Sequence, residues 1–191
     1  MYEVELKFRV DDPADLERRL VGLAARCREP VEQVDRYFAH PSRDFARTDE
    51  ALRLRRVGDD LAVTWKGPRV DAATKTRQEL ELAVARVVEG AKVVTIDRWT
   101  ALLEALGFRP VREVSKRRRA ARVPWQGADV EVALDDVTGL GAFVELELVA
   151  LAGQVPQARG CIESLAMALG CTQPERRSYL ELLLANTPVV R

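Results

Sequence analysis

Three short stretches of the sequence repeat one arrangement, in which two glutamates are separated by a single residue. The pairs are Glu3/Glu5, Glu79/Glu81 and Glu145/Glu147, and each has aliphatic neighbours. If these stretches are β-strands, both acids of a pair face the same way, with Cα atoms about 6.6 Å apart. One pair alone holds a cation poorly, whereas pairs that converge from several strands hold one well. Because the donors are all oxygen, without His or Cys, the pattern favours Mg²⁺ or Mn²⁺.

Basic residues show the same alternation in other stretches. Arg53 and Arg55 alternate with leucines, Lys66 lies on the adjoining stretch, and Lys116 and Arg118 occupy alternate positions of a basic run. The planar guanidinium group of arginine matches the oxygens of a phosphate. Acids that hold a metal on one side, with Arg and Lys on the other, describe a site for a polyphosphate carried as its metal complex.

Strands must present these side chains, and the first ten residues have a clear strand pattern. Apolar residues occupy the even positions from Tyr2 to Val10, and charged residues occupy the odd positions from Glu3 to Arg9. Because hairpins are broken by helices without a regular alternation, the fold class is α+β with an antiparallel sheet. We predict eight strands, at residues 1–10, 33–38, 51–57, 61–66, around 77–81, 112–123, 130–135 and around 145–147, and four helices, at about 12–23, 96–106, 156–169 and 174–185.

Eight strands can form an open sheet or a closed barrel. In an open sheet the charged faces are solvated, and this is the ordinary interpretation because a closed interior is normally apolar. Two features favour the barrel instead: acids and bases come in same-face pairs, and four helices suffice to jacket a barrel. Each unpaired ion inside costs several kcal/mol to desolvate, so the charges must pair, stay hydrated or bind ligands of opposite sign.

The composition limits the class of protein. The 191 residues include 30 basic and 30 acidic side chains, so a general affinity for nucleic acid or anionic membrane is not expected. Three cysteines and one histidine give neither a disulfide framework nor a zinc motif. No stretch approaches the roughly 20 apolar residues of a membrane span. We expect a cytoplasmic protein with a single domain over residues 1–191; a homodimer is compatible with the sequence.

The ordered set of motifs resembles the CYTH superfamily, the triphosphate tunnel metalloenzymes. Glu3-x-Glu5-x-Lys7 is similar to the signature of that family. A lone Glu-x-Glu-x-Lys is weak, because any amphipathic strand can contain it, but the whole series is specific. It continues, in the family's order, with VDRYF, EALRLR, TWKGP, RQELE, SKRRR, LDDV, LGAFVELE and RSYLELL.

The resemblance implies an eight-stranded antiparallel β tunnel with a charged interior, jacketed by about four helices, in which a triphosphate is bound with one or two divalent ions. It assigns Lys7, together with Glu5, to catalysis, and Asp135 to orienting a neighbouring base. The implied metal ligands are Glu3, Glu5, Glu145 and Glu147, with Glu79 and Glu81 direct or through water. The implied phosphate-binding residues are Arg53, Arg55, Lys66, Arg77, Lys116 and Arg118.

Two reactions share this apparatus. The sequence looks closest to the class IV adenylyl cyclases, in which the ATP ribose 3′-hydroxyl attacks the α-phosphorus and pyrophosphate leaves. In a triphosphatase, water attacks a terminal phosphorus of tripolyphosphate or, less in keeping with this sequence, of thiamine triphosphate. A binder of nucleotides or polyphosphate without catalysis is the third alternative. The run from Lys116 to Arg119 could also be a nucleic-acid patch, but strand alternation turns Arg117 and Arg119 away from Lys116 and Arg118.

Overall fold

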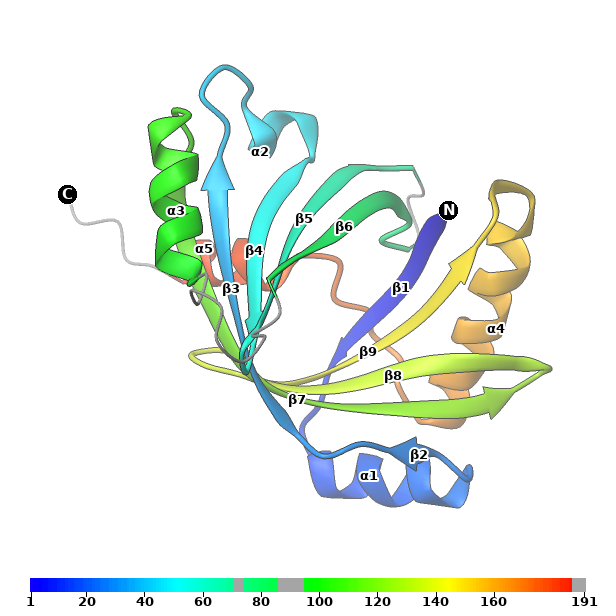
Figure 1. Ribbon diagram of the computed structural model, residues 1–191. Coiled ribbons are helices and arrows are strands. Elements are labelled where there is room, and N and C mark those ends of the chain that lie inside the picture. The colour runs from blue at the N-terminus through cyan, green and yellow to red at the C-terminus, as the bar shows by residue number, and fades with distance from the viewer. Residues whose placement is uncertain (71–73, 86–94, 187–191) are drawn as a thin grey trace.

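The computed structural model describes residues 1–70, 74–85 and 95–186. Its strands form one antiparallel sheet that curls into a barrel, with helices outside it (Figure 1). The strands are β1 (Tyr2–Arg9), β2 (Arg26–Cys27), β3 (Val31–Ala39), β4 (Ala51–Val57), β5 (Asp60–Arg69), β6 (Arg77–Ala85), β7 (Arg109–Trp125), β8 (Ala128–Val137) and β9 (Gly141–Ala150). The helices are α1 (Pro13–Gly22), α2 (Phe45–Thr48), α3 (Ile96–Ala105), α4 (Val155–Ala168) and α5 (Tyr179–Ala185), with a 3₁₀ turn at Ala152–Gln154.

The barrel closes because β7 pairs with both β3 and β8. The order around it is β7-β3-β4-β5-β6-β1-β9-β8, and the last strand returns to β7. The predicted eight-stranded antiparallel tunnel is therefore confirmed. The short strand β2, which was not predicted, adds to β7 at two residue pairs. The pairing of β1 with β6 is similarly short, with two residue pairs, Tyr2 with Gln78 and Glu3 with Arg77.

The main hydrophobic core lies outside the barrel. In β1 the even residues Val4, Leu6 and Phe8 are buried, and so are Glu5 and Lys7 on the opposite face. The even residues pack with α1, α4 and the outward faces of β8 and β9. Figure 1 shows both helices outside the barrel. The alternation of the first strand thus separates two buried environments, an apolar one beneath the helices and a charged one inside the barrel.

Local capping fixes where the helices begin. Asp12 caps α1 by accepting a hydrogen bond from the amide of Asp15, as the Asp-Pro sequence predicts. Residues 41–49, between β3 and β4, contain the single turn α2, capped by Asp44. None of the helices in the described parts of the chain is long and apolar enough to cross a membrane.

The last helix is shorter than predicted. We expected it over residues 174–185, but α5 begins at Tyr179 because Ser178 and Glu181 form a capping box there. The preceding residues instead run beside β1, where the amide of Glu175 donates to the carbonyl of Lys7 at 2.6 Å. The helix packs on Tyr37, Val114 and Phe143. These three residues share the inward strand faces of Asp35, Lys116 and Glu145, so α5 covers one end of the barrel interior.

Candidate functional site

The barrel interior contains a cavity of about 620 Å³. It brings together eleven of the fourteen site residues that the sequence predicts. The other three, Glu79, Glu81 and Asp135, contact residues of the lining. The predicted residues in the lining are Glu3, Glu5, Lys7, Arg53, Arg55, Lys66, Arg77, Lys116, Arg118, Glu145 and Glu147.

Four of the acids come from the neighbouring strands β1 and β9. Glu5 lies directly opposite Glu147, and Lys7 lies opposite Glu145. In an antiparallel pair, opposite residues hold their Cβ atoms about 5 Å apart, so the carboxylates gather on one wall of the cavity. Glu5 accepts from Nζ of Lys75 at 2.6 Å, and Glu145 forms an ion pair with Arg118.

The remaining two acids of this wall crowd each other. Burial and the nearby Glu147 raise the pKa of Glu3 to about 9. Burial, together with Glu145 and Glu5, raises the pKa of Glu147 to about 7 despite the positive charge of Arg118. A divalent cation would offset this repulsion, and the four carboxylates of this wall are the hard oxygen donors that Mg²⁺ and Mn²⁺ prefer, so their chemistry fits such an ion. Among the described residues, no three acids, histidines or cysteines lie close enough together to hold a metal ion as they stand.

The pair on β6 splits between two environments. Glu79 forms an ion pair with Lys66, whose Nζ also lies 3.7 Å from Oε2 of Glu3. Glu81 accepts from the hydroxyl of Thr64 at 2.8 Å, and its side chain is half exposed. Glu79 is thus the member of the pair that lies beside the acids of β1.

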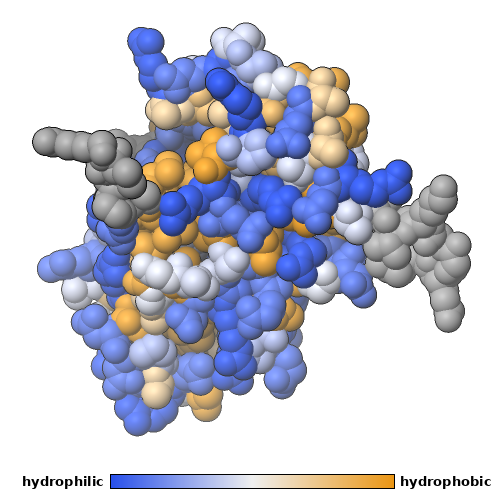
Figure 2. All heavy atoms as spheres, turned by 90° about the vertical axis from the view of Figure 1, so that its left-hand side faces the viewer, coloured by the Kyte–Doolittle hydropathy of each residue, from blue (hydrophilic) through white to orange (hydrophobic). Residues whose placement is uncertain are grey.

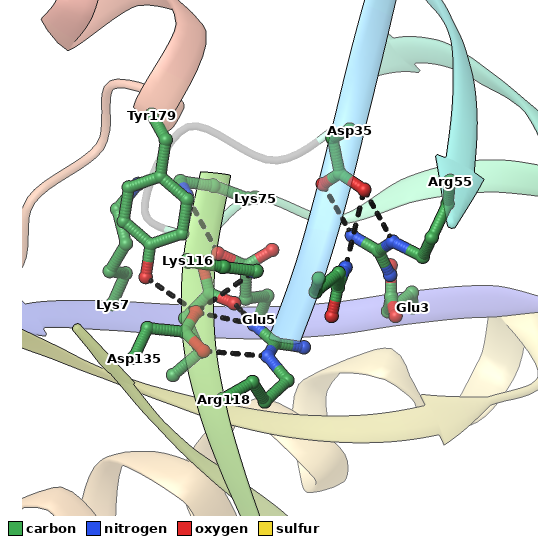
Figure 3. Close-up of polar contacts among 12 residues, drawn as sticks. Glu3, Glu5, Lys7, Asp35, Arg55, Lys75, Lys116, Arg118, Asp135 and Tyr179 are labelled. Atoms are coloured by element: carbon green, nitrogen blue, oxygen red, sulfur yellow. Dashed lines mark hydrogen bonds and ion pairs between the residues drawn. The ribbon is translucent and has the colours of Figure 1, made fainter. Parts of the chain in front are cut away.

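Two buried aspartates each hold two of the predicted phosphate-binding residues, as Figure 3 shows in part. Asp35 lies opposite Arg55 and accepts from it at 2.7 and 2.8 Å, with Nη1 of Arg53 at 3.5 Å. Asp135 lies opposite Arg118 in the same way, accepts from it at 2.7 and 2.6 Å, and accepts from Lys116 at 2.9 Å. The placement of Asp135 agrees with the predicted orienting role, which stays a prediction.

Asp35 makes part of the stability dependent on pH. Burial would raise its pKa, but the positive charges of Arg53 and Arg55 outweigh burial and hold the pKa well below its usual range. An aspartate with a lowered folded-state pKa stabilises the protein above its unfolded pKa of about 3.9, and the contribution is lost as the pH falls below that value.

We therefore predict that Asp35→Asn lowers the free energy of unfolding by about 2 kcal/mol at pH 6. The difference from wild type should shrink steadily between about pH 4 and pH 2. Urea unfolding at a series of pH values measures it, with the exposed Asp97→Asn as the control. A difference that does not change with pH would contradict this account.

Lys7 is buried at the end of the cavity that α5 covers. Its side chain is 1% exposed in the folded chain, and Nζ donates to the carbonyl oxygen of Arg177 at 2.5 Å. Burial and the neighbouring Lys75 lower the pKa of Lys7 to about 7. A lysine with such a pKa exchanges a proton near neutral pH, which is the property that a general acid or base needs.

Asp35, Lys75 and Tyr179 contact predicted site residues but were not themselves assigned a role from the sequence. Lys75 could have been found, because alternation extended back from Arg77 places it on the inward face. Its residue type is a second signal. The chain contains only five lysines against 25 arginines, and four of the five line the cavity. Asp35 and Tyr179 lie in the motifs VDRYF and RSYLELL, but their roles come from partners distant in the sequence, which the motifs do not reveal.

Outside the barrel, arginine is the usual base. Arg117 is exposed, and Arg119 forms an ion pair with Glu17 at 3.0 Å, while Lys116 and Arg118 point inward. The prediction that half of this basic run faces outward is therefore confirmed. Figure 2 shows a mainly hydrophilic surface on the α3 side of the molecule, with hydrophobic residues in small patches.

A closed antiparallel barrel with a charged interior places this chain in the class of tunnel-forming β proteins. A family model described as the CYTH domain matches residues 1–156. The chain belongs to the CYTH domain family, as its motifs indicated. A Methanocaldococcus jannaschii protein named as a candidate adenylate cyclase is 36% identical over 147 residues, which cover 77% of each chain. The adenylate cyclase CyaB of Aeromonas hydrophila is 28% identical over 187 residues, covering 95% of this chain and 88% of that one.

Solved structures share the whole fold. A protein of Pyrococcus horikoshii has a TM-score of 0.83 and 37% sequence identity, covering 97% of this chain and 99% of that one. A candidate adenylyl cyclase of Hippeastrum, described as having a dominant triphosphatase activity, has a TM-score of 0.62 and 16% identity, covering 97% and 96%. At that identity, the likeness to the Hippeastrum protein concerns the fold alone.

Proposed function

We propose that this protein is a metal-dependent enzyme that acts on a triphosphate inside the barrel, and that its reaction converts ATP into cyclic AMP and pyrophosphate. One observation carries the proposal. Two pairs of basic residues line the cavity, Arg53 with Arg55 and Lys116 with Arg118, and a buried aspartate holds each pair. The acidic pairs of β1 and β9 form the other wall.

In this mechanism, the two pairs of bases bind the phosphate oxygens of the substrate and neutralise the charge that develops on the leaving pyrophosphate. Asp35 and Asp135 orient those bases, so that little reorganisation is needed when the substrate binds. Glu3, Glu5, Glu145 and Glu147 would hold a divalent cation, which would supply Lewis-acid polarisation of the phosphate. Lys7, with its lowered pKa, holds or accepts a proton near the reacting phosphate.

The apolar part of the cavity favours a nucleotide substrate. Beyond the charged residues, the lining includes Phe45 on α2, Leu52 on β4 and Leu180 on α5. Inorganic tripolyphosphate has no group that would use such a surface, whereas a purine base can stack on an aromatic ring. The names of the M. jannaschii and A. hydrophila relatives agree with this choice.

Replacing Phe45 should therefore separate the two substrates. We predict that Phe45→Ala raises KM for ATP about tenfold, because base–aromatic stacking contributes about 1–3 kcal/mol. KM for tripolyphosphate should stay within about twofold, and this serves as the control within one variant. Equal changes of KM for both substrates would mean that the adenine base of ATP does not contact Phe45.

Triphosphate hydrolysis is the second candidate, because the charged contacts described above need only the phosphates and because Lys7 could activate water. The two reactions are separated by incubating the protein with ATP or tripolyphosphate, each with Mg²⁺ or Mn²⁺, and resolving the products by chromatography. Cyclic AMP with pyrophosphate would support the cyclase. Orthophosphate from tripolyphosphate without cyclic AMP would support hydrolysis, and binding without products would favour a binder.

A further inference from the structure

Tyr179, the first residue of α5, contacts two lysines from distant strands. Nζ of Lys7 lies 4.0 Å from the centroid of the Tyr179 ring, and Nζ of Lys116 lies 4.9 Å from it. The hydroxyl donates a hydrogen bond of 2.9 Å to Oδ2 of Asp135, the carboxylate that also holds Lys116 (Figure 3). One aromatic side chain therefore contacts two lysines and the carboxylate that pairs with one of them.

An aromatic ring does something here that a carboxylate cannot. Lys7 and Lys116 are 1% and 3% exposed, so both ammonium groups need partners inside the protein. The face of an aromatic ring attracts a cation without carrying a negative charge. It can thus orient the two ammonium groups without adding an anion that would compete with a phosphate for them.

The position of the ring is fixed from outside the cluster. Tyr179 packs edge-on against Phe143, with the ring centroids 5.1 Å apart. The capping box of Ser178 and Glu181 fixes the backbone at the start of α5, and Glu181 also lies 3.4 Å from Nη2 of Arg69 on β5. The position of the ring is therefore fixed both by the C-terminal helix and by the wall of the barrel.

We propose that Tyr179 is a positioning residue for phosphate binding, whose ring holds the ammonium groups of Lys7 and Lys116 in place for the anion. The inference rests on the proposed function of the cavity, and it makes the C-terminal helix part of the phosphate-binding site. Residues 157–191 lie beyond the segment that the CYTH model matches, so this part of the site is supplied by the end of the chain.

Two variants of Tyr179 separate the ring from the hydroxyl. The probe is imidotriphosphate with Mg²⁺, a non-hydrolysable analogue of tripolyphosphate, and its Kd is measured by calorimetry. Tyr179→Phe keeps the ring, so Kd should stay within about threefold of wild type. Tyr179→Leu keeps an apolar side chain but removes the ring, and Kd should rise about tenfold. An equal rise in both variants would overturn the assignment to the ring.

A control on the same helix excludes a merely structural effect. Leu182 is buried in the same hydrophobic cluster as Tyr179, so Leu182→Ala should lower the thermal unfolding temperature without changing Kd. The same rise of Kd in Leu182→Ala as in Tyr179→Leu would overturn the inference, and so would an unchanged Kd in Tyr179→Leu. If the wild-type protein does not bind imidotriphosphate at all, the proposed function fails as well.

Spectroscopy of the wild-type protein gives a second test, in which variants serve only to assign the signals. With only five lysines, protein labelled with ¹³C in the lysine ε-methylene gives one signal for each. The ring current of Tyr179 should shift two of them upfield, those of Lys7 and Lys116, which Lys→Arg variants assign. Ordinary shifts for both lysines would overturn the contact on which the inference is built.

Discussion

Replacing both Glu3 and Glu147 with glutamine is expected to lower metal-dependent turnover about a thousandfold without lowering stability. The loss follows because the double variant removes two of the four carboxylates proposed to hold the divalent ion, whose contribution to catalysis is several kcal/mol. Stability should be preserved because burial and neighbouring carboxylates raise the pKa values of Glu3 and Glu147, so the ionised form of each is disfavoured in the folded protein.

The measurement combines kinetics at saturating Mn²⁺ with thermal unfolding in the absence of metal. Glu113→Gln is the matched control, because Glu113 lies on the outer face of the barrel, where it pairs with Arg36 at 3.1 Å. Turnover equal to that of wild type would show that the metal ion is not bound at this wall. A fall in the unfolding temperature that parallels the fall in turnover would show instead that the two acids act through the fold.

The second large effect concerns stability. Asp135→Asn is expected to lower the free energy of unfolding by about 3–5 kcal/mol, because breaking a buried ion pair leaves charges without a partner in a poorly solvated site. The side chain of Asp135 is fully buried and accepts hydrogen bonds from Lys116, Arg118 and Tyr179. Since whole domains are stable by about 5–15 kcal/mol, this is a large share of the total.

Urea denaturation at neutral pH measures the effect. Asp129→Asn, on the same strand, is the control: Asp129 is half exposed and lies 3.6 Å from Arg26, so its loss should cost well under 1 kcal/mol. Similar values for the two variants would mean that the cavity is better hydrated than the burial of Asp135 implies, and that its ion pairs contribute little.

Much of this site could be predicted because a strand turns alternate residues to opposite sides. The inward direction of Glu5 and Lys7, and the separation of Lys116 from Arg117, follow from that rule alone. The closed barrel was also predictable, but only by weighing repeated charged pairs against the usual preference for an apolar interior. The directions of these side chains depend on residues close together in the chain, and the barrel on a pattern that repeats along it.

What sequence could not supply is the register between distant segments. Asp35 holds Arg55 because β3 and β4 pair with these two residues opposite each other, and nothing near either residue specifies that pairing. Lys7 meets the carbonyl of Arg177, 170 positions away. The start of α5 was misplaced for a related reason: residues before Ser178 lie beside β1, an interaction that a local helix pattern does not contain.

The division between lysine and arginine also makes the inside of this molecule chemically distinct from its outside. Four of the five primary amines on side chains lie in the cavity, and Lys92 is outside the described residues. A small anionic aldehyde that enters the cavity would thus find most of the reactive amines there, whereas the guanidinium groups outside do not form imines under the same conditions. Amine-selective labelling therefore becomes a probe of access to the tunnel, and a bound triphosphate would protect against it.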